Sequence, residues 1–133
     1  MRKVPQILFA LVASLVLLMF GAGCQRPDPV QEEIQHVRDR TMPSAARLVR
    51  TVATERTAWS VTASWEIETD ESWKQYSDWV AERLGGDYVT AEASDSGRVL
   101  RRNLLGDVYV LQIEPTSTGS PLRVRARFSA SPE

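Results

Sequence analysis

Residues 58–69 read AWSVTASWEIET, and this stretch decides the class of fold. Apolar side chains occupy every second position: Trp59, Val61, Ala63, Trp65 and Ile67. Polar side chains fill the positions between them: Ser60, Thr62, Ser64, Glu66 and Glu68. A period of two is typical of a β-strand with one buried face and one wet face. The stretch therefore predicts an antiparallel sheet that is covered on one side only.

An amphipathic helix is predicted directly after this strand, from about Asp70 to Leu84. Its apolar residues fall at i, i+3, i+7 and i+11, which places them in one stripe: Trp73, Tyr76, Val80 and Leu84. Thr69 or Asp70 is expected to cap its start. Gly85-Gly86 is expected to end it, with one glycine in the left-handed conformation. We expect the stripe to pack on the Trp59/Trp65 face of the strand.

Further strands are predicted beyond the helix, over residues 87–94, 98–104, 108–114 and 122–129. The last of these is as regular as the first, because Leu122, Val124, Ala126 and Phe128 alternate with polar residues. Residues 129–133 are expected to fray. The turns between strands are too short for parallel crossovers. The predicted fold is a small α+β domain, with an antiparallel sheet of about four to five strands and one or two helices on one face.

Two segments precede residue 58 in the predicted mature chain. Residues 24–42 are interpreted as a tether or stem, because residues 25–29 are polar and Pro-interrupted. A short helix or a disordered stem is expected after them. Residues 43–56 are predicted to form a helix, since Ala45, Leu48, Val49 and Val52 fall at i, i+3, i+4 and i+7. We expect this helix to pack on the sheet, with a membrane-surface helix as the alternative. The folded domain is then 43–133.

The first 23 residues have the three parts of a secretory signal peptide. Arg2 and Lys3 supply positive charge, residues 7–20 are almost wholly apolar, and Gly21-Ala22-Gly23 precede the only cysteine, Cys24. A transmembrane helix is the alternative. It needs about 20 apolar residues, whereas the apolar run here is nearer 14.

Gly21-Ala22-Gly23-Cys24 resembles the lipobox of bacterial lipoproteins, and the resemblance covers residues 1–24 only. Gly21 stands where that family usually has Leu. The resemblance implies cleavage of 1–23, diacylglycerol on the thiol of Cys24, and often a further acyl chain, such as palmitate, on its amino group. Gln25 after the cysteine implies the periplasmic face of the outer membrane in a two-membrane host. In a one-membrane host it implies the outer face of the plasma membrane.

Composition excludes several classes of function. The chain has 16 basic and 17 acidic residues and a net charge of −1, so a nucleic-acid binder receives no support. One Cys and one His exclude an intrachain disulfide and a Cys-rich or multi-His metal site. No cofactor or metal is expected. Loss of Arg2 and Lys3 with the leader leaves 14 basic and 17 acidic residues.

The best candidate binding surface is basic. Arg123, Arg125 and Arg127 project from one face of the last predicted strand, with Arg98, Arg101 and Arg102 nearby in sequence. They either bind an anionic lipid or envelope polymer, or pair across strands with glutamates, which we favour. The candidate partners are Glu66, Glu68, Glu92 and Glu114. Three of the four tryptophans lie on predicted core faces, which leaves Trp79 as a candidate ligand contact.

No catalytic residues are predicted. The single histidine, His36, lies in the predicted stem, so no base is available to activate a serine. Glu66 and Glu68 could approach each other, but a solvated pair is expected on a wet face. The chain is predicted to be a lipid-anchored envelope lipoprotein and a non-enzymatic interaction module. Its expected partners are the membrane and another envelope protein or polymer; the alternative is a module that binds an anionic ligand through the arginine face.

Overall fold

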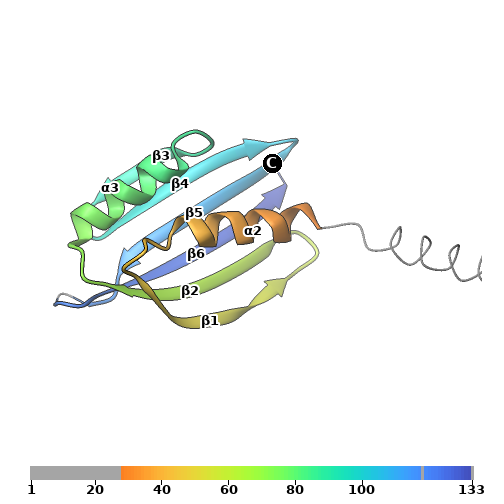
Figure 1. Cartoon of the computed structure of the whole chain (residues 1–133). Coiled ribbons are helices and arrows are strands. Elements are labelled where there is room, and N and C mark those ends of the chain that lie inside the picture. Colours follow the sequence, from red (N-terminus) through yellow and green to blue (C-terminus); the bar gives the residue numbers. More distant parts are fainter. Residues whose placement is uncertain (1–27, 118, 133) are drawn as a thin grey trace, which may run out of the picture.

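The domain is built on one antiparallel sheet, and both described helices pack on the same face of it (Figure 1). The structure is a computed structural model that describes residues 28–117 and 119–132. Its strands stand in the order β1-β2-β6-β5-β4-β3. The elements are α2 (Pro29–Arg40), β1 (Arg47–Arg56), β2 (Val61–Thr69), α3 (Trp73–Leu84), β3 (Val89–Ser94), β4 (Gly97–Leu104), β5 (Asp107–Pro115) and β6 (Leu122–Pro132). The predicted α+β class is confirmed, with six strands in the sheet instead of four to five.

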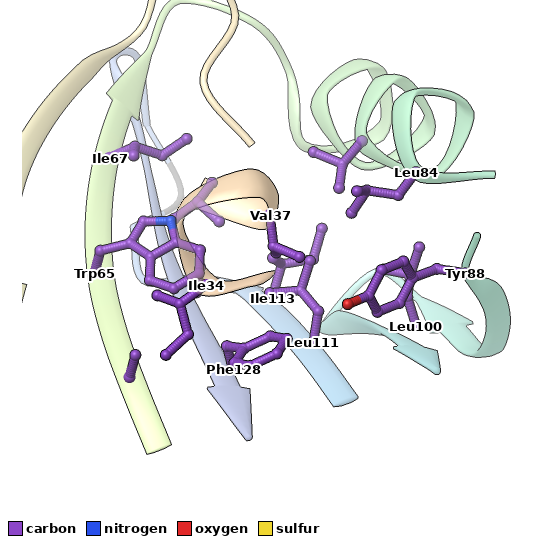
Figure 2. Close-up of a cluster of buried hydrophobic side chains, with 14 of the residues drawn as sticks. Ile34, Val37, Trp65, Ile67, Leu84, Tyr88, Leu100, Leu111, Ile113 and Phe128 are labelled. Atoms are coloured by element: carbon purple, nitrogen blue, oxygen red, sulfur yellow. The ribbon is translucent and has the colours of Figure 1, made fainter. Parts of the chain in front are cut away.

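The core lies between the sheet and the two helices. Alternate residues of β2, β5 and β6 are buried, as their period of two predicts. Figure 2 shows Ile34 and Val37 of α2 among Trp65, Phe128 and other strand residues, with Leu84 of α3 close to Tyr88 and Leu100. Neither of the two helices among the described residues lies on the opposite face of the sheet (Figure 1).

The two most regular strands of the sequence, β2 and β6, are neighbours in the interior of the sheet. They pair from Val61↔Ala130 to Thr69↔Leu122 without a register shift. On the covered face Trp65 stands opposite Ala126, and both are 0% exposed. The large indole therefore packs beside a small partner, which suits a close-packed interior.

The predicted helix after β2 is confirmed, but its ends differ from the prediction. It begins at Trp73 because Ser72 is the cap: the Ser72 hydroxyl accepts from the Gln75 N–H (3.3 Å), and the Gln75 side chain accepts from the Ser72 N–H (3.2 Å). This reciprocal capping box satisfies two otherwise unpaired donors. Gly85 ends the helix in the right-handed conformation, with φ −63°. Gly86 does not have a positive φ either, so the expected left-handed glycine is not formed.

The helix predicted over residues 43–56 is wrong. Residues 47–56 form the edge strand β1, which pairs with β2 from Arg47↔Glu68 to Arg56↔Val61 and has two register shifts. Apolar residues at i, i+3, i+4 and i+7 fit a helix, but Val49, Thr51, Val52 and Thr54 are β-branched and favour a strand. Both faces of β1 are largely exposed, so burial did not impose a period of two on its sequence.

Of the short helix and the disordered stem expected after residues 25–29, the short helix is formed, and it packs on the sheet instead of standing apart from it. Residues 29–40 form α2, whose two buried residues, Ile34 and Val37, are 1% and 0% exposed in the core, with Val30 partly buried against it. These few apolar contacts hold α2 because packing on the sheet, more than the helix's own propensity, stabilises it. Residues 24–27 lie outside the described residues.

The expected fraying of residues 129–133 is wrong through Pro132. β6 continues to Pro132, and Ala130 is 5% exposed between β2 and β5. This end of the strand is held because β2 and β5 flank it as far as Ala130, and β5 alone pairs with Ser131 and Pro132. Glu133 lies outside the described residues.

Candidate functional site

The predicted lipid-attachment residue, Cys24, lies outside the described residues. The first described residue is Asp28, which caps α2. Its carboxylate Oδ1 accepts a hydrogen bond from the Val30 N–H at 3.0 Å. Arg56, the last residue of β1, donates to the other oxygen of Asp28. This guanidinium lowers the pKa of the Asp28 carboxyl below its usual 3.8. The start of α2 is therefore tied to the β1–β2 end of the sheet.

Arg123 and Arg125 lie on the uncovered face of the sheet, where each is paired with glutamate. Arg123 Nε is 3.4 Å from a Glu68 oxygen, and Glu68 also accepts from Arg47 at 2.7 Å. Arg125 stands between Glu66 of β2 (3.4 Å) and Glu114 of β5 (3.5 Å). Exposed pairs of this kind contribute about 0–1 kcal/mol each. The expected cross-strand pairing with glutamates is thus observed for two of the three predicted arginines.

Arg127 is different, because its cross-strand neighbours are neutral. Ser64 of β2 and Gln112 of β5 stand opposite it. Within residues 28–117 and 119–132 no salt bridge to Arg127 is formed. Of the three predicted arginines of β6, only Arg127 is therefore without an ionic partner in the described part of the chain, so they do not form a free row of three.

Arg98 and Arg102 do not join that surface. Their cross-strand partners on β5, Ile113 and Tyr109, are core residues, so both arginines point toward the helices. Arg98 donates to Asp78 of α3 at 3.1 Å, and Arg102 donates to Glu33 of α2 at 3.1 Å. Arg101 alone of this group faces the uncovered side, opposite Val110. The two inward arginines thus fasten the helices to the sheet.

Glu33 is a polar contact that the sequence did not predict. Its carboxylate accepts from the Tyr88 hydroxyl (2.6 Å) as well as from Arg102. Burial raises the pKa of the Tyr88 phenol, and the hydrogen bond to Glu33 raises it further. The sequence did not predict these contacts, because Glu33 lies in the segment interpreted as a stem. Its partners Tyr88 and Arg102 are separated from it by 55 and 69 positions along the chain.

Two of the four tryptophans, Trp59 and Trp79, are placed differently from the prediction. Trp65 is buried as expected, and its indole N–H donates to the Thr41 hydroxyl at 3.0 Å. Trp79, the predicted exception, is partly buried against the core and has the Arg83 guanidinium 5.3 Å from its ring centre. Trp59 is the exposed one, at 77%. Trp59 lies in the β1–β2 turn, and β2 begins only at Val61. The alternation that predicted a core position for Trp59 therefore does not extend to it.

His36 and the carboxylate pair occupy ordinary surface positions. His36 lies on α2 with Nε2 4.0 Å from an Asp87 oxygen, and its side chain is 36% exposed. Glu66 and Glu68 share one face of β2, as predicted, and each is bound by an arginine of β6. Among the residues that the structure describes, no group of three or more His, Cys, Asp or Glu is arranged to hold a metal ion.

An open hollow of about 650 Å³ lies between the start of α3 and the loop before β6. Its walls include Asp70, Glu71, Trp73, Pro115 and Ser120. At this end of α3, the N–H groups of Ser72 and Gln75 are already bound in the capping box.

No protein-family model, no curated protein and no solved structure matches this chain. Among the described residues there is also no helix that is long and apolar enough to cross a membrane.

Proposed function

We propose that this protein is a lipid-anchored lipoprotein of the bacterial cell envelope, and that its folded domain is a non-enzymatic interaction module. The observation that carries the proposal is the run from Arg2 to Cys24: a positive end, an apolar segment, and Gly21-Ala22-Gly23 directly before the only cysteine. In this proposal Cys24 becomes the first residue and carries diacylglycerol. Two or more acyl chains hold a protein firmly on a membrane, whereas one holds it marginally.

The short distance between Cys24 and the fold supports an anchoring role. Asp28 already caps α2, only four residues after Cys24. Four residues reach at most ~14 Å when fully extended. A lipid on Cys24 therefore keeps the start of α2 close to the bilayer surface. The module then acts at the membrane, on the periplasmic face of an outer membrane or on the outer face of a plasma membrane.

The non-enzymatic role is supported by how the charged side chains are used. Glu33, Glu66 and Glu68 are each bound to arginine, and these pairs link α2 to the sheet or one strand to the next. The same pairs weigh against the alternative, in which an anionic lipid or polymer binds the arginine face. Arg123 and Arg125 would have to leave their glutamates to take such a ligand.

The proposal is tested by replacing Cys24 in the full-length protein. Cells are given a fatty acid with an alkyne tag, and the purified protein is examined for the tag. We expect the natural chain and a Gln25→Ser control to be labelled, and Cys24→Ser to be unlabelled with its leader uncleaved. A natural chain that carries no lipid, or a Cys24→Ser chain labelled as strongly as the control, contradicts the proposal.

A further inference from the structure

Four features gather at one end of the sheet, which we call the α2 end (Figure 1). They are the start of α2 at Asp28, the β1–β2 turn with Trp59, the β4–β5 turn with Leu105, and the end of β6 at Pro132. The start of α2 lies beside the β1–β2 turn, because Asp28 is bound by Arg56, and Arg56 pairs with Val61 on the other side of that turn. The β3–β4 turn and the loop before β6 lie at the opposite end.

The two turns project from this end to similar heights. One row of cross-strand partners runs through the end of the sheet: Arg56, Val61, Ala130, Tyr109 and Arg102. Beyond that row the β1–β2 hairpin continues over residues 57–60, and the β4–β5 hairpin over residues 103–108. Each tip is thus two or three residues further out, or roughly 7–10 Å. Cys24, with a reach of ~14 Å from Asp28, can lie in the plane of both tips.

Trp59 forms the apolar tip of the first hairpin. Its side chain is 77% exposed. The turn is well ordered by hydrogen bonds, since the Thr57 hydroxyl accepts from the N–H groups of Trp59 (3.2 Å) and Ser60 (3.0 Å). Tryptophan favours the boundary between water and the apolar part of a bilayer, because one end of its ring is apolar and the other donates a hydrogen bond.

Leu105 forms the apolar tip of the second hairpin and is 95% exposed. Leu105 and Gly106 both have positive φ, 51° and 84°, the combination of a type I′ turn. Asn, Asp or Gly is favoured at the first of these positions, and leucine is strained there. The protein thus keeps an exposed leucine in an unfavourable conformation, where a polar residue would fit both the turn and the solvent.

Charge at the α2 end does not point to an anionic partner. Asp28 is paired with Arg56, and Glu33 with Arg102. Glu55 and Asp107 add negative charge, which outweighs the positive charge of Arg101. The paired Arg123 lies toward the other end of β6, opposite Glu68. The α2 end must therefore bind its partner surface through apolar contact and not through attraction of opposite charges.

We propose that the α2 end rests on the lipid bilayer, with Trp59 at the level of the head groups and Leu105 inserted beside it. This inference rests on the proposed lipid anchor at Cys24. The anchor brings the α2 end to the membrane, and the two tips give it a second and third point of contact. The sheet then stands out from the membrane, with the β3–β4 turn furthest from it.

The experiment uses the full-length protein, purified from membranes and reconstituted in phosphatidylcholine vesicles. A cysteine is introduced at one of two exposed turn positions, Leu105→Cys at the α2 end or the control Ser96→Cys at the opposite end, and is labelled with a bimane fluorophore. If Cys24 carries lipid through its thiol, the new cysteine is the only free thiol. Spin-labelled phosphatidylcholine then quenches any fluorophore that lies in the bilayer.

We expect quenching at residue 105 to be at least twofold stronger than at residue 96, and unchanged between low and high salt. Adding Trp59→Ser to Leu105→Cys should reduce the quenching at 105. Equal, weak quenching at both positions, or protection of residue 105 from the reagent without quenching by lipid, overturns the inference while the anchor stands. The natural chain without a new cysteine separates the two proposals: labelling of Cys24 itself shows that its thiol is free and contradicts the lipid anchor.

Discussion

Replacing Ile34 with alanine tests whether α2 is part of the folded domain. Ile34 is 1% exposed and belongs to the core that also contains Trp65 and Phe128 (Figure 2). The change removes three carbon atoms, at about 0.8 kcal/mol for each buried methylene, and leaves a cavity that adds to the cost. Together these give an expected loss of about 2–5 kcal/mol in the free energy of unfolding. For a domain of this size, that lowers Tm by roughly 10 °C or more.

The assay is urea unfolding of the detergent-solubilised full-length protein, followed by tryptophan fluorescence and by near-ultraviolet circular dichroism. Gln31→Ala is the matched control, since Gln31 lies on the exposed side of the same helix. We expect the control to change the free energy of unfolding by less than about 0.5 kcal/mol. If Ile34→Ala costs no more than Gln31→Ala, the packing of α2 on the sheet is refuted and residues 29–40 act as a stem.

The remaining predictions concern the polar contacts. Thr41→Val removes the acceptor of the Trp65 indole N–H in a buried site and should cost about 1–3 kcal/mol of stability in the same urea assay; a change below 0.5 kcal/mol would show that the indole is satisfied elsewhere. Glu33→Gln should cost about 1.5–3 kcal/mol, because Glu33 binds both Tyr88 and Arg102, whereas Glu32→Gln on the exposed side should be nearly neutral. The Asp28 pKa is lowered on folding, so its contribution is present above the ordinary pKa of 3.8 and is lost as the pH falls through the lower, folded value. Asp28→Asn should therefore differ from the natural chain in unfolding free energy at pH 6, with the difference shrinking below about pH 3.8; an equal difference at pH 6 and pH 2 would contradict the Arg56 pairing. Arg125→Gln, which frees Glu66 and Glu114, should destabilise by up to about 1 kcal/mol, less at high salt, whereas Arg127→Gln should not; equal effects would remove the distinction between the two arginines.

The parts of the fold that could be predicted are those where one face is buried along the whole element. β2, β5, β6 and α3 each have apolar residues along one side because the helices and the sheet bury that side. Their existence, type and inward residues follow from the sequence alone. The start of α3 was missed by three residues because Thr69, Asp70 and Ser72 are all good caps, and only the paired Gln75 marks Ser72 as the one used.

The parts that could not be predicted depend on contacts between distant segments. β1 is an exposed edge, so its sequence carries no burial signal, and pairing with β2 decides its structure. α2 has two buried residues, too few for a pattern to show that a sheet lies beneath it. The sequence of β6 predicts that its arginines share one face, but it does not predict that glutamates of neighbouring strands neutralise Arg123 and Arg125. This neutralisation requires β6 to lie between β2 and β5, which brings Glu66 and Glu114 to either side of Arg125.

The central claim is that Cys24 is the lipidated first residue of the protein, and the mass of its N-terminal peptide tests this most directly. The full-length gene is expressed, the protein is extracted from the membrane with detergent, and its proteolytic peptides are weighed. We expect a peptide that starts at Cys24 and carries the mass of a diacylglyceryl group, with or without a further acyl chain on its amino group. A peptide that starts at or near Met1, or one that contains an unmodified Cys24, would contradict the claim.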